Sequence, residues 1–274
     1  MTAADETPAV VPAQPDAPAD PRAPVPVEVL TDEELAILAG PGGLVVNPYL
    51  AELPEAEREV ALRTAYRGLL ARGIVDPPTA EALAAAVGEP TVELQVRQDV
   101  LSVVTLRRGA GATVCVARTT VLGQDYWYAH VVRDVVLIEQ VSTDGQHRFA
   151  LAAADTLGDL LLAAAVHEET TDGTGPEIEL TDPAEPPTEV VEQLGSALVR
   201  TDVVVRTVDD REPELLGLFT GPGGAWALSA QAASGGPVTA RPLTRAALDG
   251  LVRDVAERAA STAAALASAA AGAR

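Results

Sequence analysis

Few residues of this chain have the types and spacing that catalysis or metal binding needs. Its three histidines, His130, His147 and His167, lie far apart along the chain, and Cys115 is the only cysteine. Zinc sites use ligands only a few residues apart, and no such spacing is present. Cys115 alternates with valines in a strand-like run, so we expect a small core residue. The sequence predicts no metal site and no cofactor.

Hydrolysis by a serine triad is the other reaction to consider. Ser142, Asp144 and His147 could supply a nucleophile, an orienting acid and a base. However, Asp144-Gly145 is a turn signal, polar residues gather in turns, and no G-x-S-x-G nucleophile elbow is present. All 19 basic residues are arginine, which excludes a Schiff-base lysine and a Walker-type phosphate loop. We therefore expect no catalytic residues and interpret the protein as a non-enzyme.

The aromatic run Tyr126-Trp127-Tyr128 rises above this background, since it holds three of the chain's few aromatic residues. Strand alternation places Tyr126, Tyr128 and His130 on one face and Trp127 on the other. Trp127 could fill the core beneath tyrosines that cover the outer face, or the strip could dock a partner. Trp226 allows the same two interpretations. Our candidate partner-binding residues are Tyr126, Trp127, Tyr128, Trp226, and the basic pair Arg107 and Arg108, which we expect at a hairpin tip.

Composition narrows the class of protein further. The formal net charge is −21, which disfavours nucleic-acid binding. Apolar residues make up 47% and aromatic residues 3%, so the core must consist of Ala, Val and Leu. No uninterrupted stretch of 18 apolar residues and no secretory signal is present, so we expect no membrane association. A single cysteine fits a reducing compartment, and we expect a cytoplasmic protein.

The elements that must position these residues fall into successive segments. Residues 1–26 are rich in proline and predict a disordered tail. In residues 27–167, a capping box at Thr31 to Glu34 opens a short helix. A second helix carries an apolar stripe from Leu62 to Leu70, and a third begins near Thr79. Strands are then expected from Val92 to Ala152, including Leu101–Leu106, and a Leu-rich helix follows.

The second part of the chain repeats this order. The acidic stretch 168–187 predicts a linker or long surface loop. Residues 188–260 predict a helix from Thr188, four strands, and a helix opened by Thr244. The Ala-rich residues 261–274 have little to pack against, so we expect them to fray.

A weak internal duplication links the two parts. Val96-Arg97-Gln98-Asp99-Val100 reappears as Val199-Arg200-Thr201-Asp202-Val203, and each copy leads through strands to one of two tryptophans and then to a Leu-rich helix. The fold class predicted is α+β, an antiparallel sheet with helical layers and two pseudo-repeated halves. Duplicated modules of this kind usually build a scaffold or a binding surface, because neither copy needs to contain a reaction centre.

The order of segments also resembles the EspG family, cytosolic chaperones of type VII (ESX) secretion in actinobacteria. The resemblance covers about residues 27–260. It lies in the segments Val29–Leu35, Asn47–Leu50, Glu57–Glu59 and Leu69–Val75, the helix from Thr79, and Glu89-Pro90 leading into Val92–Arg97. It implies an EspG-like fold with an approximate two-fold repeat. It also implies a small helical secreted partner, PE/PPE-like or WXG-like, and no individual binding residues can be mapped from it.

The resulting hypothesis is a cytosolic chaperone or adaptor that binds a helical ESX substrate and keeps it soluble for export. Two alternatives stay open. One is a ligand-binding or enzymatic α+β domain without a recognisable motif. The other is a DNA-binding regulator that uses residues 55–100 as a winged helix, because a helix ending in Arg72-Gly73 also precedes the wing of such proteins. The oligomeric state stays open.

Overall fold

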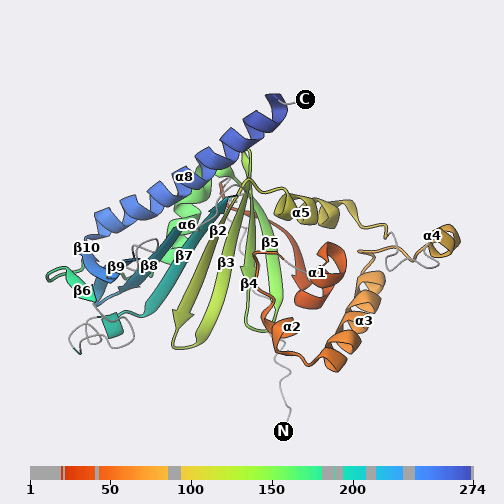
Figure 1. Ribbon diagram of the computed structural model, residues 1–274, viewed down its shortest axis with the longest axis horizontal. Coiled ribbons are helices and arrows are strands. Elements are labelled where there is room, and N and C mark those ends of the chain that lie inside the picture. The colour runs from red at the N-terminus through yellow and green to blue at the C-terminus, as the bar shows by residue number, and fades with distance from the viewer. Residues whose placement is uncertain are drawn as a thin grey trace, which may run out of the picture.

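A computed structural model describes residues 20, 22–40, 43–85, 94–180, 188, 194–207, 214–230 and 238–272. These residues form one ten-stranded antiparallel sheet in the order β1-β5-β4-β3-β2-β7-β8-β9-β10-β6 (Figure 1). The strands are β1 (Val25–Thr31), β2 (Ala112–Thr120), β3 (Gly123–Val132), β4 (Val135–Val141), β5 (Gln146–Ala153), β6 (Ile178–Leu180), β7 (Val199–Thr207), β8 (Glu214–Gly221), β9 (Gly224–Ala230) and β10 (Val238–Leu243). The helices are α1 (Asp32–Ala39), α2 (Pro48–Glu52), α3 (Glu55–Ala71), α4 (Ala80–Ala85), α5 (Gln98–Arg108), α6 (Leu157–Ala165) and α8 (Arg245–Gly272).

The sheet consists of two similar halves that meet at the β2–β7 pair. Each half is a four-stranded meander, β2 to β5 or β7 to β10, followed by a helix, α6 or α8. Each also carries one earlier strand, β1 or β6, on its outer edge. The predicted α+β class with an antiparallel sheet and two pseudo-repeated halves is therefore confirmed.

The residues that suggested the duplication are nevertheless not structurally equivalent. Val96–Val100 leads into helix α5, whereas Val199–Val203 begins strand β7. Trp127 lies on the second strand of its meander, and Trp226 lies on the third strand of the other. The five-residue match is thus a coincidence within a real architectural repeat, because the repeat preserves strand order rather than residue identity.

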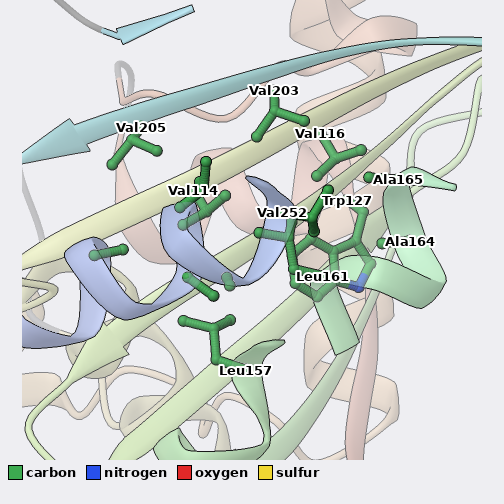
Figure 2. Packing of buried hydrophobic residues seen from close by; sticks show 14 of the residues in the cluster. Val114, Val116, Trp127, Leu157, Leu161, Ala164, Ala165, Val203, Val205 and Val252 are labelled. Atoms are coloured by element: carbon green, nitrogen blue, oxygen red, sulfur yellow. The ribbon is translucent and has the colours of Figure 1, made fainter. Parts of the chain in front are cut away.

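Helices α6 and α8 cover one face of the sheet and enclose the larger core (Figure 1). Val114, Val116, Val203 and Val205 point from β2 and β7 toward these helices, and Trp127 lies beside Leu161 of α6 (Figure 2). Small aliphatic side chains dominate this core, as the composition requires. None of the helices in the described part of the chain has the length and hydropathy of a membrane span.

Helices α1, α3 and α5 form a second layer on the other face of the first half. Helix α1 begins as predicted, because the Thr31 hydroxyl accepts from the Glu34 backbone N–H and the Glu34 carboxylate accepts from the Thr31 N–H. The loop 43–47 continues this layer, and Val45 packs on Tyr128.

The prediction of a strand at Leu101–Leu106 was wrong, because these residues belong to helix α5. Val100, Val103 and Val104 are buried at helical spacing, and the first two pack in one cluster with Leu137 and Phe149 of the sheet. Packing therefore outweighs the β-propensity of valine. Arg107 and Arg108 consequently end a helix and do not form a hairpin tip. Residues 92–93 lie outside the described part, and Val96 forms an isolated bridge with Val75.

The acidic stretch expected to be a linker contributes to the fold where it is described. Its residues Ile178–Leu180 form the edge strand β6. The Thr171 N–H donates to Gly221, the Gly173 N–H donates to Leu243, and Asp172 accepts from the backbone N–H of Arg245 at the start of α8. The helix expected from Thr188 falls mainly on residues outside the described part.

Helix α8 continues to Gly272, beyond the point where the sequence predicts fraying. Ala263 is buried, and a Cβ placed on Gly111 would lie 3.0 Å from the Ala263 Cα. The helix therefore packs closely on the start of β2 at Ala263, whereas the described residues that follow Ala263 are exposed or only partly buried.

We expect Ala263→Asp to lower the free energy of unfolding by about 1–3 kcal/mol, because the carboxylate must either be buried or detach the helix end. Ala264→Asp, on the exposed side of the same turn, is the matched control. Thermal unfolding of the two variants measures the difference, and equal melting temperatures would mean that this part of α8 is not packed.

Candidate functional site

An apolar groove opens on the face of the sheet that α6 covers, and we call it the docking groove. Its volume is about 620 Å³. Its floor comes from β3, β4, β5 and β1, and its wall comes from α6. Its apolar lining includes Trp127, Ile138, Ala150, Leu160 and Ala163. Such a concave apolar surface suits an apolar side chain or helix end.

Trp127 both fills the core and lines the docking groove. It pairs with Val116 on β2 and Gln140 on β4, and only 6% of its surface is exposed. One side packs against Leu161 and Ala164 of α6 (Figure 2). The two interpretations of this residue are thus compatible, because the tryptophan is a core residue whose remaining surface faces the groove.

The turn between β2 and β3 presents the most exposed apolar side chains of the described chain. Val121 is 97% exposed and Leu122 is 95% exposed. Just below this turn, Arg118 holds Asp125 through two hydrogen bonds of 2.7 Å, which braces the hairpin. Arg118 also lines the docking groove, so the groove and the apolar tip belong to one end of the sheet.

Sequence reasoning missed this tip. Two-residue hairpin turns favour Gly, Asn and Asp, so an aliphatic pair between Thr120 and Gly123 is an unusual choice. That mismatch between residue type and turn chemistry was the available signal. Exposed aliphatic residues at a turn bury little surface within the chain and so contribute little to folding.

The other candidate residues lie elsewhere. Tyr128 is fully buried, and its hydroxyl accepts from the Val46 N–H at 3.2 Å. Burial raises the pKa of Tyr128 above its ordinary value. Tyr126 is half-buried on the same face, with its hydroxyl donating to Gln124. Trp226 is also buried, and it points away from the face that contains Ala225 and Ala227. Tyr128 and Trp226 therefore offer little or no surface to a partner.

Arg107 belongs to a buried ionic network under α1 and α5, opposite the docking groove. The network centres on Glu139 of β4, which is fully buried. One Glu139 oxygen accepts from Arg107 Nε at 2.9 Å and from His130 Nε2 at 2.7 Å. The other accepts from His147 Nδ1 at 2.6 Å, and His147 Nε2 donates to Asp32 at 2.6 Å. The second oxygen of Asp32 accepts from the Leu50 N–H.

This arrangement favours the charged forms of both His147 and Glu139. Both ring nitrogens of His147 face carboxylates, and only the protonated ring has two N–H donors. Burial opposes its charge, but the hydrogen bonds to Asp32 and Glu139 outweigh burial and raise the pKa of His147. Burial would likewise raise the pKa of Glu139, but the bonds from His130 and His147 and the charge of Arg107 lower it well below its usual range. Two carboxylates thus balance Arg107 and His147, which ties the helical layer to the sheet.

The network makes stability depend on pH in a defined direction. Because the pKa of His147 is raised in the folded state, protonation of His147 stabilises the fold. This stabilisation is fully present at pH values below 6.5, the ordinary pKa of histidine, and is lost as pH rises through the folded-state pKa. Because the pKa of Glu139 is lowered in the folded state, its ionisation stabilises the fold at pH values above 4.5, the ordinary pKa of glutamate. This stabilisation is lost toward strongly acid pH. We expect the difference in melting temperature between wild type and His147→Gln to be largest between these two values. It should shrink as pH rises above 6.5, and a difference that stays constant to alkaline pH would contradict the assignment.

The remaining chemical candidates are not brought together. Both His147 nitrogens are occupied by carboxylates, while Ser142 bonds Asp144 within the β4–β5 turn. His167 accepts from the Glu169 N–H through Nδ1. Within the described residues, no group of three His, Cys, Asp or Glu side chains is arranged to hold a metal ion.

Comparison with known proteins gives similarity in structure but none in sequence family. No protein-family model and no curated protein matches the chain. Among solved structures, the chain is similar to the Mycobacterium tuberculosis type VII secretion system chaperone EspG5 in complex with the PE25–PPE41 dimer. The TM-score is 0.47 and the identity 11%, over 86% of this chain and 96% of that chain. At this level no residue of one protein can be matched to a residue of the other.

Proposed function

We propose that this protein is a cytosolic, non-enzymatic chaperone or adaptor that binds the end of an elongated helical protein and keeps it soluble for export by a type VII system. The observation that carries the proposal is the exposed Val121-Leu122 tip beside the docking groove. The resemblance of the segment order to the EspG family supplies the class of partner, a PE/PPE-like or WXG-like helical protein.

The groove and the tip would act together on such a partner. A helical hairpin ends in a short loop flanked by apolar positions that are exposed when it is alone. The docking groove would take one of these side chains against Trp127 and Leu160, while Val121 and Leu122 would pack along the partner's flank. Burying each tip side chain contributes about 1.5–3 kcal/mol, from which the entropy cost of association is subtracted. The partner's apolar end would thereby be kept from aggregating.

The rim of the docking groove would orient the bound partner. Arg118, Arg148 and Glu28 line the groove. Arg118 is paired with Asp125, whereas the described residues form no ion pair with Arg148. The Arg148 guanidinium can donate to the carbonyl groups that end a partner helix, since a helix leaves its last carbonyls unpaired. A partner that presents a helix C-terminus next to its apolar loop fits this rim.

Co-expression with each helical-hairpin protein encoded near its gene tests the proposal. We expect one of them to become soluble only with this protein and to co-elute with it as a stoichiometric complex. If none of these proteins forms a complex with this chain, the result contradicts the proposal.

The nucleic-acid alternative receives less support from the geometry. Arg72, at the end of α3, donates to Glu28 and Glu34 and is occupied within the fold. A mobility-shift assay at low salt, where phosphate contacts are strongest, distinguishes the two functions.

A further inference from the structure

A second pocket, of about 280 Å³, lies on the face of the sheet opposite the docking groove. It opens where β2, β3 and β7 meet the ends of α1 and α5. The polar residues that line it are Arg107, Arg108, Arg206, His130, Thr113 and Thr207, and we call it the arginine pocket. In a chain with 40 acidic and 19 basic residues, a cavity lined by arginine and not by carboxylates stands out.

The side chain of Arg107 is anchored on the side away from the pocket. Its Nε donates to the buried Glu139, and its side chain is 12% exposed. Within the described chain its two Nη groups make no hydrogen bond, although they belong to a residue that lines the pocket. A fixed guanidinium with both terminal nitrogens free is the geometry that binds a carboxylate or phosphate in bidentate fashion.

Arg206 comes from β7 on the other side of the pocket. In the sheet register it lies opposite Thr113, and Thr113 lies opposite His130, so the three form one cross-strand row. The described residues offer Arg206 neither an ion pair nor a hydrogen bond, whereas Arg63, Arg118 and Arg253 elsewhere pair with carboxylates. The Thr113 hydroxyl lies 3.5 Å from His130 Nδ1 within this row.

The remaining walls of the pocket are mainly apolar. Arg108 covers the carbonyl end of helix α1, which would otherwise repel an anion. Ala39, Leu44, Val45 and Ala110 line the pocket with carbon atoms. Arg108 donates to the carbonyl of Ala39 at the end of α1, which occupies the negative end of that helix. Arg107 and Arg206 are thus left for a ligand.

We propose that the arginine pocket binds a small organic anion through a phosphate or carboxylate group. The Nη groups of Arg107 and the guanidinium of Arg206 hold the charged group. Leu44 and Val45 contact the organic part. The pocket and the docking groove lie on opposite faces, so this site is independent of partner binding.

Isothermal titration of the full chain at low ionic strength tests the proposal, with inorganic phosphate and succinate as probes and glycerol as the uncharged control. We expect saturable 1:1 binding of at least one anion. Binding of phosphate alone assigns a phosphate ester, binding of succinate alone assigns a carboxylate, and binding of both assigns an oxyanion of either kind.

Arg206→Gln removes one ligand contact from an exposed position, so the fold should be retained. We expect it to weaken anion binding roughly tenfold, the effect of one charge-assisted hydrogen bond. Arg241→Gln is the matched control, since Arg241 is an exposed strand arginine outside the pocket. The proposal is overturned if neither anion saturates, or if both variants weaken binding equally, because diffuse charge would then account for it.

Discussion

Glu139→Gln should produce the largest loss of stability of any single substitution that preserves side-chain volume. The amide cannot accept from Arg107, His130 and His147 as the carboxylate does, and it leaves two positive groups without their shared counter-charge. Removing one member of a buried ion network costs about 3–5 kcal/mol. For a protein of this size we expect the melting temperature to fall on the order of 10 °C.

Asp125→Asn provides the matched control for this prediction. It makes the same chemical change on the same sheet, but it breaks an ion pair whose side chains are 37% and 44% exposed. Exposed pairs contribute about 0–1 kcal/mol, so the melting temperature should change little. Similar shifts for the two variants would mean that Glu139 is solvated and that the network does not hold the helical layer to the sheet.

Val121→Asp with Leu122→Asp should abolish partner binding without affecting the fold. Both side chains are exposed, so the free energy of unfolding should stay within about 0.5 kcal/mol of wild type. Interface hot spots contribute about 2 kcal/mol or more each, so we expect the dissociation constant for the partner to rise about 100-fold or more. Titration of the purified partner from the co-expression experiment measures this change.

The control for the tip carries the same substitutions on exposed aliphatic residues away from the docking groove. Val60 on α3 and Leu101 on α5 are 60% and 43% exposed, and Val60→Asp with Leu101→Asp adds the same charge to the chain. Binding by this variant should equal that of wild type. If both double variants lose the partner alike, added negative charge rather than the tip is responsible.

Local patterns predicted much of the fold. The capping box at Thr31 and the start of α8 after Thr244 appear where the sequence places them, because both depend on neighbouring residues alone. Strands β2 to β5 also follow their alternation. The error at α5 arose because valines occur in both strands and helices, and only tertiary packing of Val100, Val103 and Val104 decides between them.

The ionic network could not be derived from local patterns. Asp32 and His147 are 115 residues apart in the chain, and their hydrogen bond exists only because the pairing of β1 with β5 brings the start of α1 next to the start of β5. One local signal was present. Glu139 interrupts the apolar run Val135–Ile138 and Val141, and a carboxylate on the covered side of such a strand requires a buried partner.

A photo-crosslinking amino acid at position 121 gives the most direct test of the central claim, that the hairpin tip beside the docking groove binds a helical partner. The tagged protein is irradiated in the cytosol of its own host, and the cross-linked products are identified by mass spectrometry. The same probe at position 101 on α5 is the control. We predict that a small helical-hairpin protein linked to secretion crosslinks from position 121 and not from position 101. A partner of another structural class, equal crosslinking from both positions, or no product at position 121 would contradict the claim.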